Sequence, residues 1–129
     1  MFELSQSFYF ESAHTLRRQV ERNEADGSRR VHGHTYTAEV TVCGEVDPAS
    51  GMVVDLAHLR AAIAAVREQL DHHFLDEVSG LGPPTLESLC RFIHDRLLPT
   101  VPGIASVSVG RQSSGDRCTY RPAPVDRRR

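Results

Sequence analysis

The chain has 129 residues, which is the size of one domain with a single hydrophobic core. Apolar residues make up 40% of it, and no apolar stretch reaches the length of a membrane span. The formal net charge of −2 argues against a nucleic-acid partner, and because every basic residue is arginine, a Schiff-base or P-loop lysine is excluded. No basic-then-apolar leader opens the chain, so we expect a cytoplasmic protein with neither a membrane nor a nucleic acid as partner.

Two strands separated by a long loop are predicted in the first third of the chain. Residues 2–12 alternate between apolar and polar side chains, which is typical of a half-buried strand. Residues 31–46 are rich in β-branched and aromatic side chains, with the more apolar ones at even positions, which predicts a second strand. Residues 15–31 are polar without periodicity, and ordered loops of that length are usually functional.

Three histidines are expected to meet where these strands join the loop. His32 and His34 are two residues apart on a strand and therefore share a face. If the two strands pair as antiparallel neighbours, the end of the first brings His14 beside them. Three converging imidazoles are the ligand set of a catalytic zinc site, although histidines hydrogen-bonded inside a core are the alternative.

Two helices and two further strands follow. Asp55 is a predicted N-cap for a helix whose apolar residues recur at spacings of three and four up to Leu70, and Thr85 is a predicted cap for a second helix that ends before Pro99. Residues 104–109 and 117–121 are predicted strands. The order β-β-α-α-β-β indicates an α+β fold of one domain, 1–129, with a four-stranded antiparallel sheet and two helices on one face. We expect aromatic and aliphatic side chains on the other face, which indicates a homo-oligomer.

The first helix ends in Asp71-His72-His73, for which two interpretations are open. A histidine at this position is favoured by the helix dipole alone. A carboxylate can also orient an imidazole that then serves as a general acid or base near neutral pH.

Several short motifs together resemble those of the pyruvoyl-tetrahydropterin and carboxy-tetrahydropterin synthases. The segments that carry the resemblance are 8–14, 32–34, 44–47, 51–55, 70–75, 84–87 and 118–121. The resemblance implies the tunnelling fold (T-fold), in which β-β-α-α-β-β protomers join their sheets into a barrel, as a trimer or hexamer with active sites at the subunit interfaces.

The resemblance also implies roles for individual residues. Zn²⁺ is expected to be held by the three histidines, and the catalytic pair is expected to be Asp71 and His72. Thr85 and Glu87 are expected to contact a small-molecule substrate.

Two departures from the family pattern stand out. The family's catalytic cysteine has its counterpart in Ser28, whose hydroxyl has a far higher pKa than a thiol, so Glu24 or Asp26 in the same loop is the candidate base. The family's pterin-anchoring glutamate has its counterpart in Arg111 or Gln112, depending on where a one-residue gap falls. Arginine has only donors and suits a carboxylate or phosphate, unless Arg111 is a turn residue facing solvent.

Three functions follow from these residues. The departures favour a zinc-dependent enzyme acting on an anionic, non-pterin substrate in specialised biosynthesis, by carbonyl–amine condensation or cyclisation, for example of Pictet-Spengler type. One alternative is a 6-pyruvoyl- or 6-carboxytetrahydropterin synthase that uses dihydroneopterin triphosphate. The other alternative is a non-catalytic oligomeric binding protein.

Overall fold

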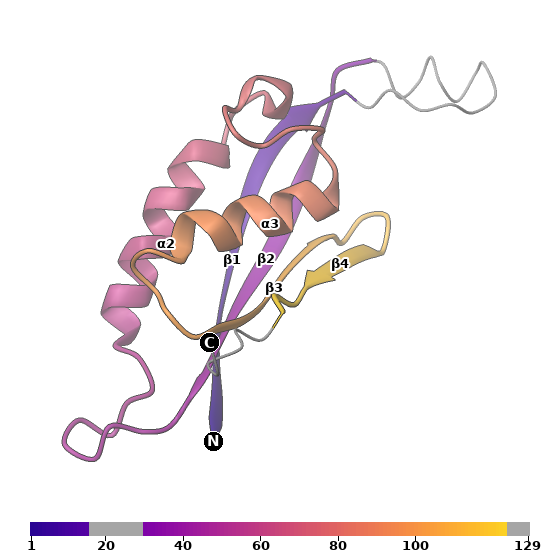
Figure 1. Ribbon diagram of the computed structural model, residues 1–129. Coiled ribbons are helices and arrows are strands. Elements are labelled where there is room, and N and C mark those ends of the chain that lie inside the picture. The colour runs from indigo at the N-terminus through magenta and orange to yellow at the C-terminus, as the bar shows by residue number, and fades with distance from the viewer. Residues whose placement is uncertain (16–29, 124–129) are drawn as a thin grey trace.

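The computed structural model describes residues 1–15 and 30–123. In chain order the elements are β1 (Phe2–His14), β2 (His32–Gly44), α2 (Leu56–Leu70), the short 3₁₀ helix η1 (Leu75–Glu77), α3 (Leu86–Leu97), β3 (Ile104–Arg111) and β4 (Asp116–Tyr120). The predicted α+β class and the order of its strands and long helices are confirmed, and both long helices lie on one side of the sheet (Figure 1).

The sheet is antiparallel throughout, with its strands in the order β1-β2-β3-β4. β1 and β2 form a long hairpin in constant register, from Phe2 opposite Gly44 to His14 opposite His32. Because paired residue numbers have the same parity, even-numbered side chains of both strands point to the same face. β2 ends two residues before the predicted boundary, at the point where β1 begins.

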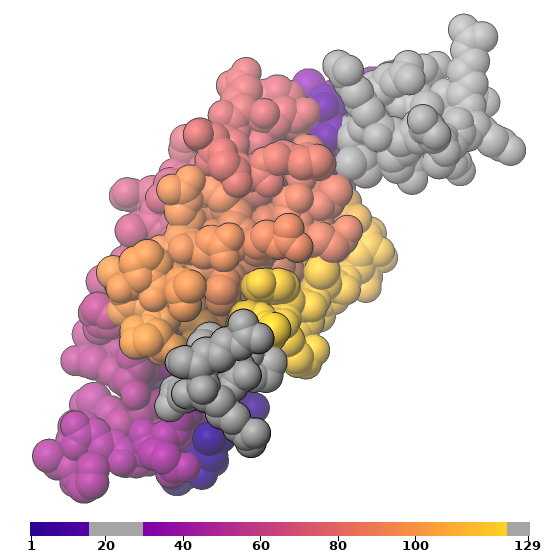
Figure 2. All heavy atoms as spheres, in the orientation of Figure 1, coloured from indigo at the N-terminus to yellow at the C-terminus, as the bar shows by residue number. Residues whose placement is uncertain are grey.

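The hydrophobic core lies between the even-numbered face of the sheet and the two long helices. On the sheet side, Phe10 and Tyr36 are almost fully buried and stack with ring centroids 5.0 Å apart. On the helix side, Leu59 of α2 and Leu89 of α3 are completely buried, as the predicted spacing requires. The space-filling view shows α2 and α3 covering the sheet (Figure 2).

Both predicted helix caps are present. The Asp55 carboxylate accepts a hydrogen bond from the Ala57 amide at 2.8 Å, and the Thr85 hydroxyl accepts one from the Ser88 amide at 3.1 Å. Each cap satisfies a donor that the first helical turn leaves free. Among the described residues, neither α2 nor α3 is long and apolar enough to span a membrane.

The face of the sheet opposite the helices is polar, so the prediction of aromatic and aliphatic side chains there is wrong. Hydroxyl groups are paired across the strands, Ser5 with Thr41 and Ser108 with Thr119, each at 2.9 Å. Tyr9, which is 59% exposed, is an isolated aromatic on this side. Hydrophilic side chains are the ordinary pattern on the solvent-exposed face of an antiparallel sheet whose other face packs against the core.

Candidate metal centre and active site

The three histidines predicted as metal ligands converge on the helix-covered face, at the open end of the β1–β2 hairpin. One ring nitrogen of each of His14, His32 and His34 lies within 4.8 Å of the others. The Nε2 atoms of His14 and His34 are 3.1 Å apart. Since a Zn–N bond is about 2.0–2.1 Å long, two nitrogens on one tetrahedral zinc are about 3.3 Å apart. The donor set and its spacing therefore fit a zinc-type ion.

Backbone carbonyl groups orient two of these rings. The Nδ1 atom of His14 is 3.0 Å from the Pro84 carbonyl oxygen, and that of His32 is 2.8 Å from the Arg30 carbonyl oxygen. A carbonyl only accepts, so the proton of each neutral ring is on Nδ1 and the lone pair is on Nε2, toward the cluster. This arrangement fixes the tautomer that a metal ion requires.

The surroundings of His14 and His34 favour the neutral form of these two imidazoles. Burial, together with the nearby His14 and Arg111, lowers the pKa of His34 to about 4. Burial is also the main cause that lowers the pKa of His14, which is 3% exposed. Because a metal ion binds the neutral ring, both shifts prepare the cluster for a cation at neutral pH.

The predicted catalytic pair lies on the connector that leaves α2 and runs beside the open edge of β1. The Asp71 carboxylate accepts a hydrogen bond from the Glu11 amide at 2.9 Å, and the His72 amide donates to the Glu11 carbonyl at 2.6 Å. The Nε2 atom of His72 is 3.8 Å from the second Asp71 oxygen, which also pairs with Arg67 at 3.1 Å. The His72 side chain is 77% exposed and its backbone has φ of 59°, in the left-handed region. An accessible imidazole beside a fixed carboxylate can exchange protons with a bound molecule.

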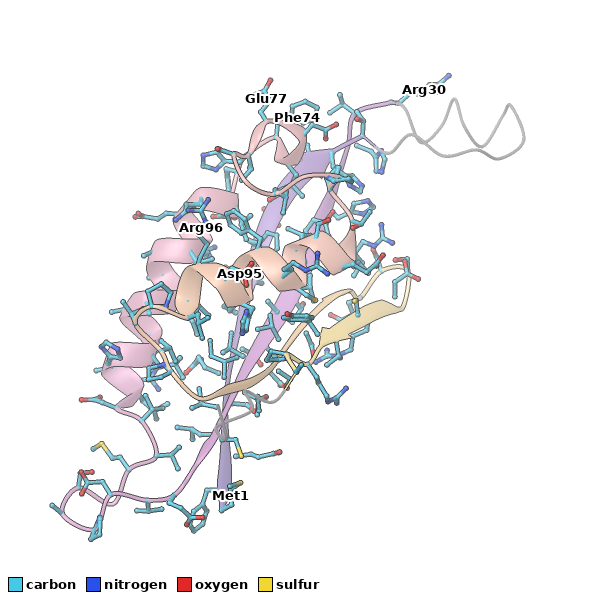
Figure 3. The ribbon with its side chains drawn as sticks, viewed as in Figure 1. Met1, Arg30, Phe74, Glu77, Asp95 and Arg96 are labelled. Atoms are coloured by element: carbon cyan, nitrogen blue, oxygen red, sulfur yellow. The ribbon has the colours of Figure 1, made fainter. Side chains whose placement is uncertain are left out.

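One cleft joins this connector to the histidine end of the hairpin. It has a volume of about 560 Å³ and includes both His34 and His72 in its lining. The rest of its wall comes from Glu11, Ser12, Ala13, Gly33, Thr35, His73 and Phe74. Phe74 and Arg30 mark this end of the molecule (Figure 3).

Of the two candidates for the family's glutamate position, Arg111 lies on the helix-covered side and Gln112 lies in an exposed turn. The Arg111 side chain is 23% exposed and donates to the Asp116 carboxylate at 2.6 Å, so the alternative of a solvent-facing turn residue is wrong. Tyr36 of β2 is the cross-strand neighbour of Arg111, because the two residues are next in register to the antiparallel pair of Thr37 and Gly110. Among the described residues, neither the buried Tyr36 hydroxyl nor the buried Arg111 Nε has a hydrogen-bond partner. Burial raises the pKa of Tyr36 to about 12.

The remaining predicted residues lie at the start of α3 or outside the described residues. Thr85 uses its hydroxyl as the helix cap, and Glu87 is exposed in the first turn. Both follow Pro84, whose carbonyl binds His14, so this helix begins beside the cluster. Glu24 and Ser28, with Asp26, fall in 16–29, outside the described part of the chain.

Sequence reasoning missed Asp76, whose carboxylate binds Thr15 next to His14. One oxygen accepts from the Thr15 amide at 2.9 Å, and the other accepts from the Thr15 hydroxyl. Partial burial raises the pKa of Asp76, but these hydrogen bonds outweigh it and the net pKa is lowered. Asp76 lies one residue after the motif 70–75. Nothing in the sequence indicates that it contacts a position some sixty residues earlier.

The sheet, its two helices and the site define a small α+β protein of the tunnelling-fold class, with a candidate three-histidine metal centre at one end of the sheet. Residues 3–123 match the family model described as 6-pyruvoyl tetrahydropterin synthase, and the chain belongs to that family.

Comparisons with individual proteins agree with this assignment. A 6-carboxy-5,6,7,8-tetrahydropterin synthase of Synechocystis is 34% identical over 115 residues, covering 84% of this chain and 85% of that protein. A dihydroneopterin monophosphate aldolase of Pyrococcus furiosus is 32% identical, covering 73% of each chain. The structure of a Caenorhabditis elegans 6-pyruvoyl tetrahydropterin synthase superposes with a TM-score of 0.81 at 25% identity, covering 95% of this chain and 96% of that one. The predicted tunnelling fold is thereby confirmed.

The low pKa of His34 makes the metal-free protein sensitive to acid. The ring takes up its proton near pH 6.5 in the unfolded chain but only near pH 4 in the folded one, so the unfolded state binds more protons in between. We expect the melting temperature of metal-free protein to fall as the pH is lowered from 6.5 to 4. His34→Gln should lose less stability over this interval, whereas His58→Gln on α2 should behave as wild type. Identical pH profiles for wild type and His34→Gln would contradict the assignment.

Proposed function

We propose that this protein is a zinc-dependent enzyme that converts a dihydropterin, as a 6-carboxy- or 6-pyruvoyltetrahydropterin synthase does with dihydroneopterin triphosphate. The observation that carries the proposal is the cluster of three imidazoles, whose ring nitrogens converge at a spacing that suits one cation, with the rings of His14 and His32 oriented by backbone carbonyl groups. The names of the relatives favour a pterin substrate over the non-pterin substrate inferred from the sequence alone.

In this proposal the histidine cluster binds the metal ion and the connector after α2 provides the proton-transfer residues. His14, His32 and His34 hold the zinc ion, which polarises a hydroxyl or carbonyl oxygen of the substrate when bound. His72 transfers protons at Nε2, and Asp71 stabilises its charged form from 3.8 Å away. Glu24 is the proposed base in place of the family cysteine, and Ser28, at the cysteine's position in the sequence, is proposed as a hydrogen-bonding group rather than a proton acceptor.

Recognition of a pterin ring requires an acceptor for its amino and ring N–H groups, and Arg111 has none. Glu87 is the proposed acceptor, because it is exposed in the first turn of α3, three residues after Pro84, whose carbonyl binds His14. Thr85 is the N-cap of the same helix, and we propose that it contacts the same ligand.

A second candidate function is favoured by the environment of Arg111. Within the part of the chain that the structure describes, the buried Arg111 Nε and the buried Tyr36 hydroxyl have no hydrogen-bond partner. Leaving buried donors unpaired costs free energy, which an acceptor oxygen of an anionic substrate would recover. This observation supports an enzyme acting on an anionic non-pterin substrate, such as a carboxylate that undergoes condensation or cyclisation with an amine.

A homo-oligomer with shared active sites is also part of the proposal. Both β1 and β4 are edge strands, and within the described part of the chain no strand pairs with the outer edge of β1 along residues 2–8. Such edges pair readily with another copy, and head-to-tail pairing closes into a ring when the rotation permits. The exposed His72 stands at the β1 edge, where it can serve the site of a neighbouring subunit.

The catalytic role of His72 is tested with zinc-loaded protein and dihydroneopterin triphosphate. We expect turnover by wild type and a loss of about 10²–10⁴-fold in kcat for His72→Ala, because a general acid or base contributes that factor. Zinc content should stay at one ion per chain, and His73→Ala should retain most of the activity. Absence of turnover by wild type would reject the pterin substrate, and full activity of His72→Ala would reject the proton-transfer role.

Substitutions at Glu87 and Arg111 separate the two candidate substrates. For a pterin, Glu87→Gln should raise KM by about tenfold or more, because a hydrogen bond to a charged acceptor is lost, and Arg111→Gln should change it far less. The reverse ranking, measured by steady-state kinetics, would support an anionic ligand held by Arg111.

Oligomeric state is measured by sedimentation velocity on the full chain. We expect a trimer or hexamer, and a proline at Ser5 on the β1 edge should shift the protein toward monomer because a strand edge with proline pairs poorly. A monomeric wild type at micromolar concentration would overturn the shared-site proposal.

A further inference from the structure

The connector between α2 and α3 is hydrogen-bonded to the end of β1 at successive points. After the two contacts with Glu11, the Ala13 amide donates to the His73 carbonyl at 3.2 Å, and Ala13 forms a parallel bridge with Phe74. The last contact in this series is made by Asp76 with Thr15. Phe74 and Glu77, labelled in Figure 3, show where this part of the connector lies, at the histidine end of the sheet.

The Asp76 contact differs from the others because it uses a side chain to hold the residue adjacent to a candidate ligand. Both carboxylate oxygens are engaged by Thr15, one by its amide and one by its hydroxyl. Thr15 follows His14 directly, so these bonds fix the backbone where β1 ends. On its other side, the His14 ring is fixed through Nδ1 by the Pro84 carbonyl. His14 is thus held from two parts of the same connector.

The charge of Asp76 is also placed to act on the cluster. The carboxylate acts electrostatically on His14, in the direction that favours positive charge there. Arg111 acts in the opposite direction on both His14 and His34. A dication among three neutral imidazoles would be stabilised by a nearby anion and destabilised by a nearby guanidinium.

We propose that Asp76 is a positioning residue of the metal centre, which fixes His14 through Thr15 and supplies negative charge beside the cation. The inference rests on the metal-binding part of the proposed function and is independent of which substrate the enzyme takes. Outer-shell partners of metal ligands typically affect metal affinity by 10–100-fold, which sets the scale expected for Asp76.

Zinc affinity, measured by competition with a chromophoric chelator on the full chain, tests this role. Asp76→Ala should bind zinc about 10–100-fold more weakly than wild type. Asp76→Asn, which keeps an acceptor for the Thr15 amide but loses the charge, should lie between them. Thr15→Val removes the hydroxyl contact alone and should also weaken binding. Asp95→Asn is the matched control, because that carboxylate binds His94 on α3, and it should bind zinc as wild type does.

Two further readouts separate positioning from general loss of structure. Melting of the metal-free variants shows whether each one is folded at the titration temperature, and Thr15→Val and Asp76→Asn decide the question if Asp76→Ala is not. With Co²⁺ in place of zinc, the visible absorption of Asp76→Asn should differ from that of wild type, because the ligand geometry changes.

The outcomes are distinguishable. Zinc affinities of the Asp76 and Thr15 variants equal to that of wild type would overturn the inference, as would a wild type that binds no zinc. A wild type that binds zinc, loses affinity on Asp76 substitution and leaves dihydroneopterin triphosphate unchanged would support the inference while rejecting the pterin substrate.

Discussion

β1 and β2 pair residue for residue along their whole length, and that pairing places the three histidines of the candidate metal centre. Because the register never shifts, His14 must lie opposite His32, and the alternation of side chains puts His34 on the same face. A slip of one residue would turn one strand over relative to the other, which would separate His14 from His32 and His34 and expose the core residues of the turned strand. The free energy of burying Phe10 and Tyr36 therefore also maintains the ligand geometry.

Burial gives the cluster its chemistry as well as its position. The histidine end of the hairpin is covered by the start of α3, and removing water from imidazoles disfavours their charged form. Also buried are the Tyr36 hydroxyl and the Arg111 Nε, which lack hydrogen-bond partners among the described residues. His72, by contrast, stays in contact with solvent on the connector. The site thus combines a desolvated part suited to holding a cation with an accessible part suited to moving protons.

The fold was predictable because each element has a local signature. Alternation identified β1 and β2, and the caps Asp55 and Thr85 marked the helix starts correctly. The apolar character assigned to the second sheet face was wrong, since Tyr9 is an isolated aromatic among serine, threonine and glutamate side chains. Strand boundaries differed by a few residues, as pairing partners rather than local sequence determine where a strand ends.

The candidate site was predictable only where it depends on strand geometry. Parity and antiparallel pairing are sufficient to bring the three histidines together. The contact between Asp76 and Thr15 depends on the path of the connector, which no periodicity encodes. The Pro84 carbonyl that orients His14 is a backbone group and has no sequence signature. The choice between Arg111 and Gln112 likewise required the β3 register, which assigns Arg111 to the buried side.

The connector beside β1 has a consequence for assembly. It occupies the strand's outer hydrogen-bonding groups at Glu11 and Ala13, and the Arg67 guanidinium binds the Tyr9 carbonyl at 2.7 Å. A strand from another chain can therefore extend along β1 only as far as this blocked stretch. The blocked stretch limits how far a strand of a neighbouring chain can shift along β1. Pairing in a shifted register, which would let sheets add to one another without end, is therefore disfavoured.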